Sequence, residues 1–192
     1  MRKIVIGVGG ASGAPYAHRV LSFLADHASE AGVEPHVVFS RMGKLVFGDE
    51  VGVDPREYGF PLYSPGDMTA PFASGSARFD AMVVVPCSAA GMARIAHGVS
   101  TDLIGRAAEV MLKERKKLLL VLRESPYSLV QLKNMVAVTE AGAMVMPASP
   151  SFYSNPRSTE ALLDTVTARI FDQLDIDNGL MKRWTGRHGG AQ

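Results

Sequence analysis

The sequence has 192 residues, of which 47% are hydrophobic, so it can bury one proper core but is short for two domains. Its 20 basic and 19 acidic residues leave a net charge of +1, which excludes a strong overall field for nucleic acid or an anionic membrane. The only cysteine, Cys87, cannot form an internal disulfide, and no Cys or His spacing indicates a metal site. We therefore expect one cytoplasmic domain over residues 1–192, with a frayed C-terminal tail at about 183–192.

Short apolar strands alternate with amphipathic helices along the chain. In chain order the pattern predicts strand 3–8, helix 14–27, strand 36–39, helix 42–50, strand 81–85, a helix after Ser88, helix 101–117, strand 118–122, helix 129–141, strand 143–146 and helix 159–174. The Pro-, Gly- and Ser-rich stretch 51–77 is interpreted as an ordered excursion beside the active site. This alternation predicts an α/β fold of the Rossmann-like or flavodoxin-like kind, a three-layer sandwich whose parallel sheet is covered by helices on both faces.

A glycine-rich turn, Gly9-Gly10-Ala11-Ser12-Gly13, separates the first predicted strand from the first helix. Backbone N–H groups and a helix N-terminus at such a turn favour an anion, usually a phosphate. The turn departs from the dinucleotide fingerprint at Ser12, and the second strand ends in Ser40 instead of an acidic residue. We therefore favour a mononucleotide over a dinucleotide. A Walker A loop is excluded because no Gly-Lys-Ser/Thr follows, and a tight turn without a ligand remains the alternative.

Three basic residues are candidates for a second anion site. Arg106 and Lys113 are seven residues apart on one predicted helix and share a face, and Arg123 directly follows an apolar strand. They could converge, although a solvated helix face is the alternative. Cys87 is interpreted as a small buried residue and not as a nucleophile, because no histidine stands near it in the sequence.

Several separated motifs occur in an order that resembles the UbiX/Pad flavin prenyltransferase family. The resemblance covers residues 3–184. The motifs are Gly10-Ala11-Ser12-Gly13-Ala14, Ala73-Ser74-Gly75-Ser76, Pro86-Cys87-Ser88, the block 102–116 around Arg106 and Lys113, Arg123-Glu124-Ser125-Pro126, Pro150-Ser151-Phe152-Tyr153 and Arg183-Trp184. No single motif is decisive, but the ordered set is specific.

The resemblance implies a set of site residues, each matched position by position. The implied FMN-binding residues are Gly10, Ala11, Ser12, Ser40, Ser88, Ala89, Ala90, Gly91 and Arg123. Those implied to hold the dimethylallyl phosphate are Arg106, Lys113, Tyr153, Arg169 and Trp184, with Trp184 as an aromatic wall. The implied catalytic residues are Glu50, Glu124, Ser12 and Lys113. Glu50 and Arg169 enter only through the resemblance, since spacing alone selects neither.

The resemblance also implies a reaction. Reduced FMN is joined through N5 and C6 to the dimethylallyl group of a small phosphate ester, without a metal, and prenylated FMN is the product. Cations that oppose the charge of the departing phosphate and a dry aromatic pocket suit such chemistry. The implied partners are other copies of the chain, in a homo-oligomer such as a dodecamer, and a UbiD-like decarboxylase that uses the product.

One position departs from the family pattern. The family has threonine three residues after the serine of Pro-Cys-Ser, whereas this chain has Gly91 there. A hydroxyl group for the flavin is thereby lost. Two other functions remain open: a flavin-dependent decarboxylase, although the histidine and the Pro-x-Met-Asn segment of cysteine decarboxylases are missing, and an FMN-binding carrier subunit, which would not need Lys113, Glu124, Tyr153 and Arg169.

Overall fold

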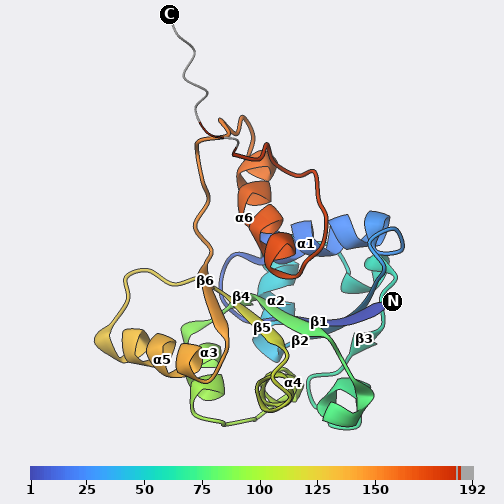
Figure 1. Ribbon diagram of the computed structural model, residues 1–192, viewed down its shortest axis with the longest axis vertical. Helices are drawn as coiled ribbons and strands as arrows, with labels where there is room; N and C mark the ends of the chain where they lie inside the picture. The colour runs from blue at the N-terminus through green and yellow to red at the C-terminus, as the bar shows by residue number, and fades with distance from the viewer. Residues whose placement is uncertain (185, 187–192) are drawn as a thin grey trace, which may run out of the picture.

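The computed structural model describes residues 1–184 and 186 (Figure 1). Its sheet contains β1 (Arg2–Val8), β2 (Val33–Phe39), β3 (Leu62–Tyr63), β4 (Ala81–Cys87), β5 (Lys117–Leu122) and β6 (Met144–Pro147), in the order β3-β2-β1-β4-β5-β6. All neighbouring strands are parallel. The predicted α/β fold is confirmed. The direction of winding reverses between β1 and β4, which is where ligands bind in open sheets of this kind.

Helices cover both faces of the sheet (Figure 1). One face packs against α1 (Ala14–His27), α2 (Arg41–Glu50) and α6 (Thr159–Gln173), and the other against α3 (Ala89–Ala96), α4 (Leu103–Lys113) and α5 (Leu129–Glu140). Alternate side chains of each central strand serve the two cores: Ile4 and Ile6 of β1 lie in the first, and Val5 lies in the second. Strands buried on both sides explain the uninterrupted apolar runs in the sequence.

Several predicted boundaries differ from the structure; the strand predicted over 36–39, for example, begins at Val33. The helix predicted over 101–117 ends at Lys113, because Arg115 takes a left-handed conformation with φ 53° and the N–H of Lys116 returns to the carbonyl of Met111. Lys117 already belongs to β5. The excursion 51–77 is ordered, as predicted, but it adds the two-residue strand β3 and three short 3-10 helices, η1 (Pro55–Tyr58), η2 (Pro71–Ala73) and η3 (Gly75–Ala77).

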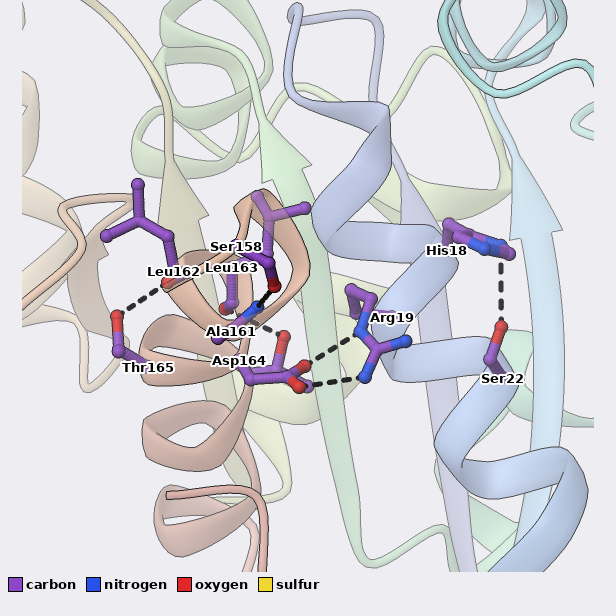
Figure 2. Close-up of polar contacts among 10 residues, drawn as sticks. His18, Arg19, Ser22, Ser158, Ala161, Leu162, Leu163, Asp164 and Thr165 are labelled. Atoms are coloured by element: carbon purple, nitrogen blue, oxygen red, sulfur yellow. Dashed lines mark hydrogen bonds and ion pairs between the residues drawn. The ribbon is translucent and has the colours of Figure 1, made fainter. Parts of the chain in front are cut away.

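An ion pair joins the first and last helices across the α1–α6 face. Arg19 donates from Nε to Oδ1 of Asp164 at 2.7 Å and from Nη2 to Oδ2 at 2.8 Å (Figure 2). The pair is bidentate because both carboxylate oxygens accept a hydrogen bond. Only 12% of the Asp164 side chain is exposed, so the pair is largely shielded from water. It fixes α6 on α1 and thereby sets the position of the residues that α6 carries.

Among residues 1–184 and 186, no helix is both long and apolar enough to cross a bilayer. The C-terminal tail predicted to fray beyond Trp184 falls mostly on residues 185 and 187–192, which lie outside the described residues. The division into one domain over 1–192 stays a prediction.

Candidate active site

The turn after β1 is packed too closely for side chains at its glycines. Gly9 donates to the carbonyl of Pro86 at 3.0 Å, and a Cβ atom at Gly9 would lie 2.6 Å from that oxygen. A Cβ atom at Gly10 would lie 2.5 Å from Cβ of Met42 at the start of α2. Since real Cβ atoms do not approach so closely, glycine is required where the turn passes between β4 and α2. The turn is thus held between the carboxyl end of β4 and the N-terminus of α2.

Glu50 is the last residue of α2, and its carboxylate lies at the N-terminus of α1. Its Oε2 accepts hydrogen bonds from the N–H groups of Gly13 and Ala14, both at 2.8 Å. Burial acts to raise the pKa of the Glu50 carboxyl, but hydrogen bonds from the Ser12 side chain and these two amides, together with the charge of Arg123, outweigh it and lower the pKa. Glu50 is therefore held as a carboxylate at the positive end of a helix.

Arg123 ties the end of β5 to the same turn. Its Nε donates to the carbonyl of Ser12 at 2.7 Å, and its backbone N–H donates to the carbonyl of Cys87 at 3.1 Å. The structure therefore brings together Ser12, Glu50 and Arg123, which lie far apart in the sequence.

Two serines begin the helices that follow β2 and β4. Ser40 accepts from the N–H of Gly43 at 2.9 Å, and Ser88 accepts from the N–H of Gly91 at 3.1 Å. Both side chains are N-caps, the role in which serine is most common. A small cavity lies at the switch point, and we call it the cup. Its lining includes Gly9, Gly10, Ser40, Ser88, Gly91, Arg94 and Asp102.

The cup offers donors to an anion. Among the described residues, the backbone N–H groups of Gly10, Ala11 and Ser12 have no hydrogen-bond acceptor. Ala89 and Ala90 start α3 directly after Ser88 and carry no polar side chain. Cys87 also lines the cup and is buried, and burial raises the pKa of its thiol to about 12. This supports the interpretation of Cys87 as a small buried residue, since the thiolate is the reactive form.

A second cavity lies beside β6 and α6. Its lining includes Ser149, Ser151, Tyr153, Thr165 and Arg169. The ring of Tyr153 meets the ring of Trp184 edge to face, with centroids 5.9 Å apart. The structure thus places Tyr153 beside two of the predicted donor-binding residues.

Asp172 connects the two basic residues of this region. Its Oδ2 pairs with Arg169 at 2.7 Å, and its Oδ1 pairs with Arg183 at 2.6 Å. Because Arg183 precedes Trp184, the second pair anchors the segment that carries the tryptophan onto α6. Trp184 itself is 65% exposed and Tyr153 56% exposed, so one chain leaves much of this aromatic pair open.

Arg106 and Lys113 lie on α4, on the other face of the sheet from α6. Arg106 donates to the carbonyl of Ala73 at 3.0 Å and pairs with Glu109, and Lys113 pairs with Glu114. Lys113 ends α4 four residues before β5 begins, whereas Arg123 follows the end of β5. The strand between them spans roughly 20 Å. Within one chain Lys113 therefore does not meet Arg123, although their places in the sequence predicted that the two could converge.

Glu124 stands next to Arg123 at the carboxyl end of β5. Its Oε1 accepts from the N–H of Ser125 at 3.0 Å, which orients the carboxylate locally. The side chain is half-exposed and follows the carboxyl end of β5, at the same edge of the sheet as the turn after β1. It is therefore available to a bound molecule.

Known proteins similar to this chain identify its family. A family model described as Flavoprotein matches residues 1–184. The chain belongs to the flavoprotein family. Curated relatives include flavin prenyltransferase UbiX of Methanocaldococcus jannaschii, 40% identical over 95% of this chain and 98% of the relative, and flavin prenyltransferase UbiX of Thermoplasma acidophilum, 43% identical over 95% and 99%. The predicted resemblance to the flavin prenyltransferases is confirmed.

Solved structures agree with this family. AnUbiX (PadA1), crystallised with FMN and dimethylallyl pyrophosphate, superposes with a TM-score of 0.91 at 41% identity, covering 96% of this chain and 98% of that one. A dodecameric FMN-dependent UbiX-like decarboxylase from Escherichia coli O157:H7 gives a TM-score of 0.90 at 36% identity, covering 96% and 100%. The FMN-dependent cysteine decarboxylase SpaF, at 16% identity and a TM-score of 0.62, shares the fold alone.

The cup of this flavoprotein fits the phosphate of FMN. Gly9 and Gly10 leave no room for side chains, N–H groups of the same turn have no acceptor among the described residues, and two serine hydroxyls stand at helix N-termini, as suits a bound anion. One lining residue, Arg94, was not predicted from the sequence. The only signal for it is its spacing, since Arg94 lies three residues after Gly91 and therefore on the same helix face.

Proposed function

We propose that this protein is a flavin prenyltransferase that transfers the dimethylallyl group of dimethylallyl phosphate to N5 and C6 of reduced FMN and so makes prenylated FMN. The observation that supports the proposal is the cup at the switch point, where the turn after β1 meets Ser40 and Ser88, and where Arg123 donates to the carbonyl of Ser12 in the same turn. The relatives at about 40% identity supply the reaction class.

The flavin-binding residues hold the acceptor in place. Backbone N–H groups of the turn and the hydroxyls of Ser40 and Ser88 bind the phosphate, and Arg123 holds the turn against β5. Reduced FMN supplies the nucleophilic atoms when it is bound. Glu50, ionised and fixed on α1, orients Ser12 at the edge of the cup.

The remaining predicted residues act on the prenyl donor. Arg106, Lys113 and Arg169 oppose the negative charge that grows on the departing phosphate. Tyr153 and Trp184 form an aromatic face that excludes water and favours an allylic cation. Glu124 moves a proton, either to the leaving phosphate or away from flavin C6.

We propose that the active unit is a homo-oligomer whose donor site combines residues of neighbouring copies. A single chain leaves Arg106 and Lys113 on the opposite face of the sheet from Arg169, and one relative is described as dodecameric. Leu129, Val130 and Val136 of α5 are exposed apolar residues of the kind that such contacts cover. We further propose a cytoplasmic location and a UbiD-like decarboxylase as the user of the product.

The test is to mix the purified chain anaerobically with reduced FMN and dimethylallyl monophosphate or diphosphate, and to measure the mass and absorbance of the flavin. We expect a flavin heavier by one five-carbon prenyl unit. The product should be lost in Glu124→Gln and strongly reduced in Arg106→Ala. Glu30→Gln, which removes a carboxylate at the far end of α1, serves as the matched control and should leave the yield unchanged.

Two results would contradict the proposal. FMN that binds but stays unmodified with every allylic phosphate would favour a carrier subunit. Release of carbon dioxide from a peptidyl cysteine would favour the function of a cysteine decarboxylase such as SpaF, which shares only the fold with this chain.

A further inference from the structure

The helix that follows Ser88 lacks the hydroxyl that the family resemblance places there. Gly91 stands at that position, and its N–H donates a hydrogen bond to Ser88 Oγ at 3.1 Å. A Cβ atom at Gly91 would lie 3.2 Å from the same oxygen, so the space beside Ser88 is narrow but not filled. The cup is therefore short of one side-chain donor and correspondingly more open on the α3 side.

Arg94 lies one helical turn further along α3 and lines the same cup. Residues three apart on a helix share a face, so a long side chain at 94 can reach the space above Gly91. Cys87 lines the same cup; burial raises the pKa of its thiol, and the charge of Arg94 acts in the opposite direction with a smaller effect. Among residues 1–184 and 186, no carboxylate lies within ion-pairing distance of Arg94.

Four other polar side chains near the cup already make hydrogen bonds within the chain. Ser40 and Ser88 accept from the helix N–H groups they cap, and Asp102 accepts from the N–H of Gly105 at 2.8 Å. Arg123 is turned to the carbonyl of Ser12. Arg94 is thus the cation of the cup that has no protein partner among the described residues, and it presents five N–H donors in a planar fork suited to a phosphate.

We propose that Arg94 binds the phosphate of FMN and replaces the hydroxyl that is missing at Gly91. The proposal rests on the proposed function, because it assigns a residue to the flavin side of that site. The exchange substitutes a charged, bidentate contact for a neutral one. FMN should therefore be favoured over riboflavin in this chain chiefly through Arg94.

The experiment is an equilibrium titration of the flavin-free protein with FMN and with riboflavin, followed by quenching of flavin fluorescence. Arg94→Gln should weaken FMN binding ~10- to 100-fold and leave riboflavin binding within ~2-fold. Arg94→Lys, which keeps the charge but not the fork, should give an intermediate loss. The double variant Gly91→Thr with Arg94→Gln restores the family hydroxyl and should recover part of the FMN affinity.

Arg78→Gln is the matched control, because Arg78 is an exposed arginine that precedes β4 at the opposite edge of the sheet. It should bind both flavins like the unaltered chain. Unchanged FMN affinity in Arg94→Gln, or an equal loss for FMN and riboflavin, would overturn the assignment of Arg94 while prenyl transfer by the unaltered chain continued. Failure of the unaltered chain to bind FMN would instead contradict the proposed function itself.

Discussion

The flavin side and the donor side of the proposed site differ in how much of each a single chain assembles. On the flavin side, the turn after β1, Glu50 and Arg123 are joined by hydrogen bonds of 2.7 to 2.8 Å that come from three separate elements. On the donor side, Arg169 pairs with Asp172 on its own helix, and Lys113 pairs with its neighbour Glu114 on the far face of the sheet.

This difference teaches which step depends on the fold of one chain. The flavin side is preorganised, so binding FMN requires little rearrangement. The cations of the proposed donor side are paired with local carboxylates and lie on opposite faces of the sheet, so under our proposal a neighbouring copy brings them to one phosphate. Flavin binding should therefore be a property of the chain, and prenyl transfer a property of the assembly.

The largest expected effect comes from mixing two inactive variants. Lys113→Ala and Arg169→Ala should each lower the rate of transfer more than ~100-fold, because each removes a cation from the departing phosphate. If the donor site takes Lys113 and Arg169 from different copies, co-expressed variants will form some sites with both residues intact. About a quarter of the activity should return in a random mixture within a symmetric oligomer.

The measurement is the initial rate of prenylated flavin formation by each purified protein and by the mixed oligomer. Two copies of the same variant, differing only in their purification tags, form the control and should stay inactive. Activity that never returns on mixing would mean that each site is built within one chain, and the contrast between the two sides would fail.

Two glycines of α2 test how tightly the flavin side is packed. A Cβ atom at Gly43 would overlap the carbonyl oxygen of Val8, whereas nothing lies within 4 Å of one at Gly48. Gly43→Ala should lower the free energy of unfolding by ~1–3 kcal/mol and weaken FMN binding, because α2 must move away from the turn. Gly48→Ala should raise it by ~0.5–1 kcal/mol. Thermal melts measure the stability of each variant, and FMN titrations measure its affinity. Equal effects of Gly43→Ala and Gly48→Ala would show that α2 is not closely packed against the turn.

The sequence predicted the flavin side better than the donor side for a physical reason. Parallel strands end at one edge of a sheet, so Ser40, Ser88 and Arg123 could be placed together from strand positions alone. The turn needed glycine, and the glycine cluster was visible in the sequence. Glu50 could not be found in this way, because its contact with Gly13 and Ala14 depends on how α2 lies against α1.

The geometry of the donor side could not be predicted from the sequence, because its cations lie on helices and not at the ends of strands. The spacing of Arg106 and Lys113 correctly placed both residues on one helix. It could not show at which edge of the sheet that helix ends. The end of α4 itself was missed because residues 114–116 contain no Gly or Pro, although Arg115 turns into the left-handed region. β3 was missed because two residues carry too little periodicity to indicate a strand.

The Arg19–Asp164 pair offers a smaller effect that should separate stability from flavin binding. Asp164→Asn removes one charge from a partly buried bidentate pair and leaves Arg19 without its carboxylate, which should cost ~1–3 kcal/mol. FMN affinity should not change, because α6 does not line the cup. The KM for the prenyl donor should rise slightly, since α6 carries Arg169. Chemical denaturation and steady-state kinetics measure these quantities, and a change in FMN affinity would contradict the separation.

The smallest effect concerns the charge of Glu50 and its dependence on pH. The folded protein lowers the pKa of this carboxyl below its ordinary value of 4.5, so the folded state binds the proton less tightly than the unfolded chain does. The resulting stabilisation is complete above that ordinary value and is lost as the pH falls through the lower folded value. Since Glu50 is largely exposed, solvent screening limits the gain, and Glu50→Gln should cost only about 0.5–1 kcal/mol at neutral pH.

Urea denaturation of both proteins across this pH range measures the difference. The difference in the free energy of unfolding between Glu50→Gln and the unaltered chain should vanish in acid, because protonation makes the carboxyl as neutral as the amide. Asp49→Asn, one residue earlier and without a hydrogen bond to α1 among the described residues, controls for removing a charge from the end of α2. A gap that stays constant into acid would mean that Glu50 acts on α1 through its shape, and that its charge contributes nothing to holding the turn in place.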